Sequence, residues 1–180
     1  AASFALLVYA SCWIKCHHPA EFLAAMLNSQ PLGFYSASQL VQDAKRHGVE
    51  VRRVDVMSSE WDCTLEGLPH PPAVRLGLRL VVGLKAESAL RILKARRERP
   101  FDGAEDLARR AEIEQHEMTL LAAADALMSL AGHRRQQVWE AAGQRSAPQL
   151  LKQAPVNEEE LELPAAPEGE EVVWDYAATG

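Results

Sequence analysis

The sequence predicts a mainly α-helical fold with a few short strands, followed by an acidic segment punctuated by prolines. Alanine takes 29 of the 180 positions and leucine 23, whereas aromatic residues make up only 6%, and this bias is typical of helices. The 48% hydrophobic and 24% charged residues match a globular protein with a core. Several segments also place apolar residues at helical spacing, with Pro and Gly between them.

Two helices are expected at the start of the chain. Residues 4–17 are apolar nearly all round, which predicts a buried helix. Its apolar run of about eleven residues is much shorter than the ~20 needed to span a bilayer, and it lacks the basic region and cleavage site of a signal peptide. We therefore expect a cytoplasmic protein without a membrane partner. Pro19 suits the first position of a second helix, which ends near Asn28.

A third helix and three short strands are expected next. Ser36-x-x-Gln39 is a capping box that opens the helix, and Gly48 supplies its C-terminal stop. Strands are predicted at residues 49–51, 61–65 and 73–76.

The following part is expected to be helical. A short helix over residues 78–81 leads into a tight turn at Gly83-Leu84-Lys85. Further helices are expected after that turn, after a cap at Asp102, as one continuous helix over 114–130 that Gly132 ends, and over 134–142.

Charge is segregated along the chain. The net charge is −6, but residues 155–180 hold eight acids and no Lys or Arg. Residues 1–154 therefore carry 19 bases against 17 acids, a net charge of +2, and residues 75–110 carry ten bases against five acids. The total charge alone would argue against a nucleic-acid partner, whereas the segregated pattern leaves room for one.

The C-terminal part is predicted to contain a linker and the start of another domain. Residues 143–171 are polar and acidic, which predicts a linker. Val172-Val173-Trp174 is strand-like, so residues 172–180 are expected to begin a further, truncated domain. Because the chain also opens without Met inside a helical pattern, we expect a fragment of a longer protein.

The cysteines bear on compartment and on metal binding. Cys12, Cys16 and Cys63 are odd in number, which argues against a disulfide framework and for a reducing compartment. Cys12-x-x-x-Cys16-His17-His18 could place zinc ligands on one helix face, but the usual short Cys-x-x-Cys turn and second ligand pair are missing. We interpret the cysteines as small buried residues of a packed helix, and we expect no cofactor and no metal-binding residue in this chain.

One segment matches a functional motif. Residues 80–92, with Gly83-Leu84-Lys85 at the turn, fit a helix-hairpin-helix pattern. A glycine turn before a helix exposes backbone N–H groups where the helix dipole favours an anion. A DNA backbone phosphate fits there without base contact, so binding to duplex DNA would not depend on sequence. The residues expected to bind DNA are Arg75, Arg79, Gly83, Leu84 and Lys85.

Two features limit this motif. Lys85 stands where the usual hairpin has a second glycine, and an αα-hairpin with a solvated basic face is the structural alternative. The other basic runs, at residues 94–99, 109–110 and 133–135, are expected to be solvated helix faces.

Several separated segments, in one order, resemble the bacterial DNA polymerase III alpha subunit family. The longest is Trp13-Ile14-Lys15-Cys16-His17-His18-Pro19-Ala20-Glu21-Phe22, and the others are residues 1–6, 60–63, 75–78 and 131–134. Residues 27–35 and 121–127 are similar to the error-prone, damage-tolerance branch of that family.

The resemblance implies a domain layout. Residues 1–66 would be the C-terminal part of the polymerase fingers, residues 73–142 a tandem helix-hairpin-helix module, and residues 172–180 the start of an OB-type domain. Fingers side chains of the family position the triphosphate of the incoming nucleotide, and Lys15 is the matching basic residue. The carboxylates that bind two magnesium ions lie in the palm, outside this chain. This chain alone is therefore expected to hold no catalytic residue and not to polymerise.

The resemblance also implies partners. These are duplex DNA through its backbone phosphates, the incoming dNTP in the intact enzyme, and damage-tolerance accessory proteins. Gln149-Leu150-Leu151 matches the family's sliding-clamp peptide poorly, so the sequence gives little support for direct clamp binding. We expect a fragment of an error-prone DNA-directed DNA polymerase of replication and translesion synthesis. The alternatives are a stand-alone, non-catalytic DNA-binding or scaffold protein with this hairpin, and a purely structural helical bundle.

Overall fold

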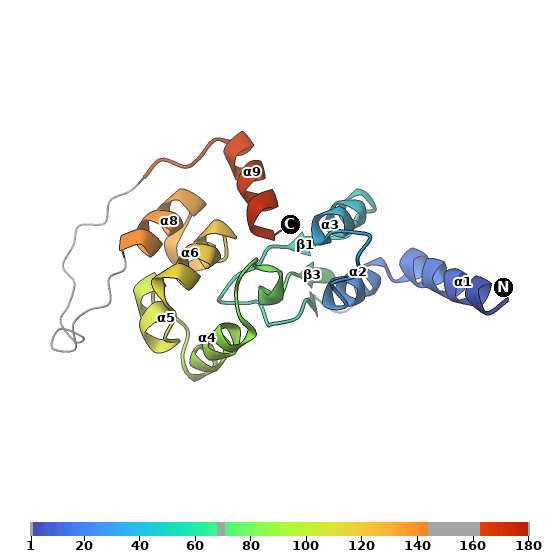
Figure 1. The fold of residues 1–180 in the computed structure, drawn as a ribbon, viewed down its shortest axis with the longest axis horizontal. Coiled ribbons are helices and arrows are strands. Elements are labelled where there is room, and N and C mark those ends of the chain that lie inside the picture. Colours follow the sequence, from blue (N-terminus) through green and yellow to red (C-terminus); the bar gives the residue numbers. More distant parts are fainter. Residues whose placement is uncertain (1, 68–70, 144–162, 180) are drawn as a thin grey trace.

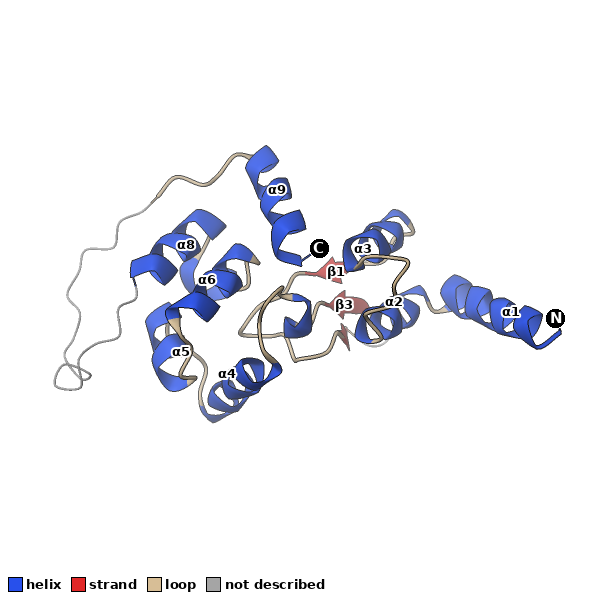
Figure 2. Cartoon of the chain, in the orientation of Figure 1, coloured by secondary structure: helices blue, strands red, loops and turns tan. Residues whose placement is uncertain are grey.

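The computed structural model describes residues 2–67, 71–143 and 163–179 (Figure 1). Helices dominate, and a small sheet lies between the N-terminal helices and a larger group of later helices (Figure 2). The prediction of a mainly α-helical fold with a few short strands is therefore confirmed.

The N-terminal helices are α1 (Ala2–His17), α2 (Pro19–Asn28) and α3 (Ala37–Arg46). Pro19 begins α2 as predicted. The predicted capping box opens α3: the Gln39 N–H donates to Ser36 Oγ at 3.2 Å, and the Ser36 N–H donates to Gln39 Oε1 at 3.1 Å. These two helix starts follow from local sequence signals alone.

Helix α1 contradicts the prediction of a buried helix. It extends away from the rest of the molecule (Figure 1), and residues 3–17 are all exposed. Phe4 is 73% and Tyr9 68% exposed. Cys12 and Cys16 are exposed as well, so of the three cysteines only Cys63 fits the buried role expected for them. Because α1 is largely apolar, its side chains would be stabilised by packing on another surface. Among the described residues, α2 is the element that packs against α1.

The three strands are β1 (Val51–Arg52), β2 (Thr64–Glu66) and β3 (Ala73–Arg75). They lie in the order β1-β3-β2, with β1 parallel and β2 antiparallel to β3. The third strand begins where it was predicted, whereas the first begins two residues and the second three residues later than predicted. One face of the sheet packs on α2 and α3, and Leu23, Leu27 and Val74 are buried in this smaller core.

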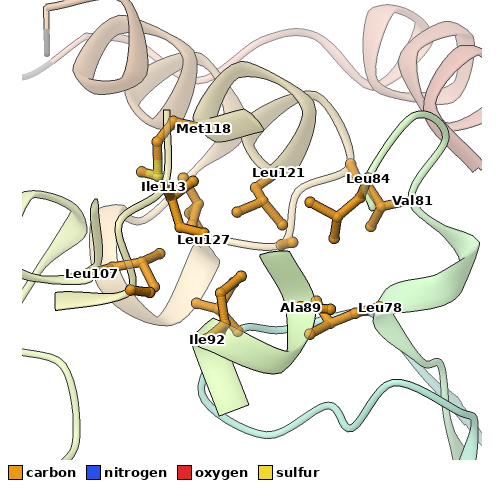
Figure 3. Packing of buried hydrophobic residues seen from close by; sticks show 14 of the residues in the cluster. Leu78, Val81, Leu84, Ala89, Ile92, Leu107, Ile113, Met118, Leu121 and Leu127 are labelled. Carbon is orange, nitrogen blue, oxygen red and sulfur yellow. The ribbon is translucent and has the colours of Figure 1, made fainter. Parts of the chain in front are cut away.

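The later helices are the 3₁₀-helix η1 (Leu78–Leu80), α4 (Ala86–Glu98), α5 (Ala104–Arg110), α6 (Gln115–Ala123), α7 (Met128–Ala131) and α8 (Arg134–Gly143). They share the larger core, which includes Leu78, Ile92, Leu107, Met118 and Leu121 (Figure 3). All five of these side chains are completely buried. This single core fixes the later helices relative to one another.

Two predictions for this part are wrong. Residues 114–130 do not form one helix, because Asp125 adopts a left-handed conformation with φ 55° and separates α6 from α7. Asp102 does not cap α5, whose N-terminal cap is Gly103 without a side-chain hydrogen bond. The Asp102 carboxylate instead pairs with Arg99 at 2.5 Å.

The C-terminal end also differs from the prediction. Residues 168–179 form helix α9 (Glu168–Thr179), so the strand expected over residues 172–174 is wrong. Ala178 is buried in the larger core, and α9 contacts α6 and α3. Most of the predicted linker, including Gln149-Leu150-Leu151, lies outside the described residues. The domain boundaries expected from the resemblance stay predictions.

Candidate nucleic-acid interface

The first hairpin consists of η1, a turn and α4 (residues 78–98). Gly83 has φ 85°, in the left-handed region that glycine adopts without strain. The Leu84 N–H donates to the Val81 carbonyl at 3.2 Å and closes the turn. The side chains of Val81 and Leu84 both point into the larger core (Figure 3). Leu84 therefore anchors the turn, and its side chain faces away from solvent.

The start of α4 offers backbone donors. Its N-terminal cap is Lys85, which makes no side-chain cap hydrogen bond and is exposed. Among the described residues, no hydrogen bond uses the N–H of Gly83, Lys85 or Ala86. The helix dipole adds partial positive charge at the same place. The predicted residues Gly83 and Lys85 thus lie together at a point that suits an anion, and a DNA contact by either residue stays a prediction.

Arg75 and Arg79 lie elsewhere and are engaged inside the protein. Arg75 on β3 donates to both carboxylate oxygens of Glu66, at 3.0 and 3.1 Å. Its guanidinium lowers the pKa of Glu66 below the ordinary value. Arg79 on η1 binds Asp62 at 2.7 Å and the carbonyl of Asn28 at 2.7 Å. These bonds tie the hairpin to the sheet and to α2, and a DNA contact by either arginine stays a prediction.

Other arginines expected on solvated faces are internal as well. Arg96 has only 13% of its side chain exposed and binds the Ser59 carbonyl at 2.7 Å and Glu60 at 2.6 Å. Arg110 binds the carbonyl of Arg99 at 2.9 Å and Asp106 at 3.2 Å. The prediction of solvated faces is wrong for Arg96 and Arg110, because each guanidinium satisfies oxygens at the ends of neighbouring elements. It is also wrong for Arg134, which is only 3% exposed and lies against the Trp174 ring.

A second hairpin lies within residues 73–142, for which the resemblance implied a tandem module, and it is formed by α7, a turn and α8 (residues 128–143). Its Gly132 has φ 71°, and it follows the completely buried Leu127 at the same spacing at which Gly83 follows the completely buried Leu78. The signal was therefore present in the sequence, as a repeated leucine-to-glycine spacing. The turn of the second hairpin is followed by three basic residues, His133, Arg134 and Arg135.

A buried amide holds the second turn. Gln137 is fully buried. It accepts from the Leu127 N–H at 3.1 Å and donates to the Gly132 carbonyl at 2.6 Å and to Asp125 at 2.7 Å. One side chain thus joins the beginning of α7, the turn and α8. Because all of these polar groups are satisfied, the turn is held in one conformation.

A carboxylate performs the corresponding role beneath the first hairpin. Glu117 on α6 accepts from Ser88, and it pairs with Arg91 at 3.4 Å. Burial opposes its ionisation, but the hydrogen bonds from Ser88 and from the Glu114 N–H, with the charge of Arg91, hold the pKa of Glu117 below its ordinary value. Glu117 therefore fixes α4 to α6 in its charged form.

Lys15 is not part of this surface. It lies on α1, at the opposite end of the molecule from α4, α5 and α8 (Figure 1). Its ammonium pairs with Asp43 on α3 at 2.7 Å, and about half of each side chain is exposed. The hydrogen bond from Lys15 lowers the pKa of Asp43. A role of Lys15 at a nucleotide stays a prediction.

No three His, Cys, Asp or Glu side chains of residues 2–67, 71–143 and 163–179 gather as ligands for a metal ion. None of the helices in the described part of the chain is both long and apolar enough to cross a membrane.

Comparisons with known proteins agree with this geometry. A family model described as the helix-hairpin-helix motif matches residues 48–137, which include the first hairpin and most of the second. Three similar proteins carry the name error-prone DNA polymerase. The one from Azoarcus sp. (strain BH72) is 55% identical over 100% of this chain and 18% of its own length. The protein from Methylococcus capsulatus is 50% identical over 99% of this chain and 19% of its own length. The protein from Aromatoleum aromaticum is 53% identical over 100% of this chain and 17% of its own length.

The chain spans less than a fifth of the length of these relatives. Within that span the similarity covers all or nearly all of its residues at 50% identity or more. The chain therefore belongs to the helix-hairpin-helix family, and over its whole length it is similar to one segment of error-prone DNA polymerases.

Proposed function

We propose that this chain contacts the backbone of duplex DNA, independently of base sequence, through its two hairpin turns. The observation that carries the proposal is the repeated geometry: a buried leucine, a left-handed glycine and then a helix N-terminus, at both Gly83 and Gly132. Both hairpins contribute to the same buried core, so the two turns are fixed relative to each other. Backbone N–H groups at helix N-termini bind phosphate oxygens and read no sequence.

Lys85 and Arg135 supply cationic side chains for this contact. Lys85 is exposed beside the first turn, and Arg135 has 36% of its side chain exposed beside the second. Each would neutralise a phosphate and release counterions, so affinity would fall steeply as salt is raised. Gly83 and Leu84 shape the first turn. Arg75 and Arg79 support it from the sheet side, in addition to the DNA contact predicted for them.

The activity of the whole protein is part of the same proposal. The relatives carry the name error-prone DNA polymerase, which supports a DNA-directed DNA polymerase. That this polymerase acts in replication and in damage-tolerant synthesis, in the cytoplasm, is part of our proposal. Residues 1–66 would belong to its fingers, with Lys15 near the triphosphate of the incoming dNTP, and damage-tolerance proteins would be its accessory partners. Residues 172–180 would lead into an OB-type domain, of which the chain contains only the helical start.

Magnesium chemistry belongs to another part of such a polymerase. The reaction uses metal ions that bridge the phosphates and neutralise the developing charge. The residues described in this chain do not gather the carboxylates that such ions need. We propose, from the resemblance to the polymerase family, that the metal site lies in the palm, outside this chain.

The test is equilibrium binding of the full chain to two fluorescent duplexes of unrelated sequence, between 50 and 200 mM salt. We expect equal Kd values for the two duplexes and a Kd that rises steeply with salt. Lys85→Glu should weaken binding to both duplexes alike, whereas Lys45→Glu, the same charge change at an exposed residue on α3, should leave it nearly unchanged. Absent binding at 50 mM salt would contradict the proposal and favour a purely structural helical bundle.

A further inference from the structure

One segment of the chain contacts both hairpin turns. We call residues 163–179 the C-terminal segment; it runs beside α8 and α6 and includes α9 (Figure 1). At its far end, the carbonyl of Ala178 accepts a hydrogen bond from the Val82 N–H, at 3.0 Å, in the first turn. At its near end, the carbonyl of Leu163 lies 2.7 Å from Nε2 of His133 in the second turn. Both hairpin turns are therefore in contact with the same segment, which at the first turn bonds the N–H next to Gly83.

The groups that the C-terminal segment places there are oxygens and a carboxylate. Arg135 donates to the Pro164 carbonyl at 3.3 Å and pairs with Glu170 at 3.2 Å. The Ala178 carbonyl belongs to the last turn of α9, where the helix dipole is negative. These are the same kinds of acceptor that a DNA phosphate would present to the turns.

Charge and packing favour the docked arrangement. Residues 163–179 contain four acids and no Lys or Arg, and one of these acids, Glu170, pairs with Arg135 beside the second turn. The guanidinium of Arg134 lies 5.9 Å from the ring centroid of Trp174, within the range of a cation–π contact. Ala178 is 9% exposed and packs on the larger core. The C-terminal segment is thus held by both polar and apolar contacts.

We propose that the C-terminal segment is an intramolecular competitor of DNA for the two hairpin turns. The proposal rests on the proposed function, because it assumes that the turns bind phosphates. A duplex that reaches both turns displaces the Ala178 carbonyl and Glu170 from them. The apparent Kd for duplex is then the intrinsic Kd divided by the fraction of molecules in which the segment is undocked.

The first test uses two substitutions that weaken docking without truncating the chain. Glu170→Gln removes the partner of Arg135, and Trp174→Ala removes the ring under Arg134. The matched controls are Glu105→Gln, which makes the same charge change at an exposed residue of α5, and Trp13→Ala on α1. We expect the double variant Glu170→Gln, Trp174→Ala to bind duplex about threefold or more tightly than the control double variant.

The second test measures backbone hydrogen exchange in α9 of the unmodified full chain. An isolated helix of this length is marginally stable in water, so its amides should exchange faster when duplex is added. Equal affinities of the two double variants, together with unchanged exchange in α9, would overturn the competition while leaving the proposed function standing. If none of the variants binds duplex even at low salt, the proposed function itself fails.

Discussion

The two hairpins reach the same backbone geometry by different chemistry. In the first, Val81 and Leu84 anchor the turn in the apolar core, and the nearest side chain to Gly83 is Leu120. In the second, the buried amide of Gln137 holds the turn by three hydrogen bonds. The comparison teaches that the spacing from a buried leucine to a left-handed glycine defines the motif, and that the groups supporting the turn can differ.

The basic residues are distributed unequally as well. Arg79 beside the first turn is used to bind Asp62 and carbonyl groups of the α2 end, which leaves Lys85 as its exposed cation. Arg135 beside the second turn faces the C-terminal segment. Charge at the first hairpin therefore mainly holds the fold together, whereas Arg135 at the second hairpin contacts the C-terminal segment.

The largest expected difference between the hairpins concerns the residue before the buried leucine. A Cβ on Gly77 would lie 2.4 Å from the Trp61 carbonyl oxygen, whereas the corresponding residue of the second hairpin is the buried Ala126. Gly77→Ala should lower the free energy of unfolding by about 3 kcal/mol or more, measured by urea denaturation. Ala126→Gly should cost only about 1 kcal/mol. Equal costs at the two positions would contradict the comparison.

A smaller difference is expected at the turn glycines. Both have positive φ, so alanine costs roughly 1–2 kcal/mol at either position through backbone strain. A Cβ on Gly83 would also lie 3.2 Å from Leu120, whereas one on Gly132 would meet open space. Gly83→Ala should therefore destabilise the protein more than Gly132→Ala in thermal and urea unfolding. The reverse order would show that the environment of the first turn is looser than the structure indicates.

The smallest difference is a dependence on pH. Because the pKa of Glu117 in the folded protein lies below its ordinary value of 4.5, its stabilising contribution is complete above that value and is lost as the pH falls through the lowered pKa. Gln137 in the second hairpin does not titrate. Glu117→Gln should thus flatten the fall of the melting temperature between about pH 5 and pH 3. An unchanged pH profile would show that Glu117 does not link α4 to α6 in its charged form.

Local signals predicted several elements correctly. Helices α2 and α3 begin at Pro19 and after Ser36 because a proline and a capping box act within one helical turn. The first hairpin turn was found because Gly83 and the apolar residues around it follow a short pattern. The family itself was identified from separated segments that agree in order.

The wrong predictions concern features that are determined by contacts between residues far apart in the sequence. The apolar α1 was expected to be buried, but burial requires a covering surface, which a helical pattern does not specify. At the break, Asp125 accepts a hydrogen bond from the buried Gln137, twelve residues away in the sequence, and the Asp102 carboxylate pairs with Arg99 while Gly103 stands at the N-terminal cap of α5. Residues 172–174 have strand propensity, but they belong to helix α9, which contacts α6 and α3. The sequence also did not indicate that Arg75 pairs with Glu66 and Arg79 with Asp62, because only the fold brings these residues together.

The most direct test of the central claim, that both hairpin turns contact DNA phosphates, is the slope of log Kd against log salt concentration. It would be measured for the full chain and for the variants Lys85→Glu, Arg135→Glu and the double variant, each with the same duplex. The account predicts that each substitution lowers the slope by about one and that the double variant lowers it by about two, because each cation releases counterions from one phosphate. A slope that none of these variants changes would contradict a phosphate contact at either turn.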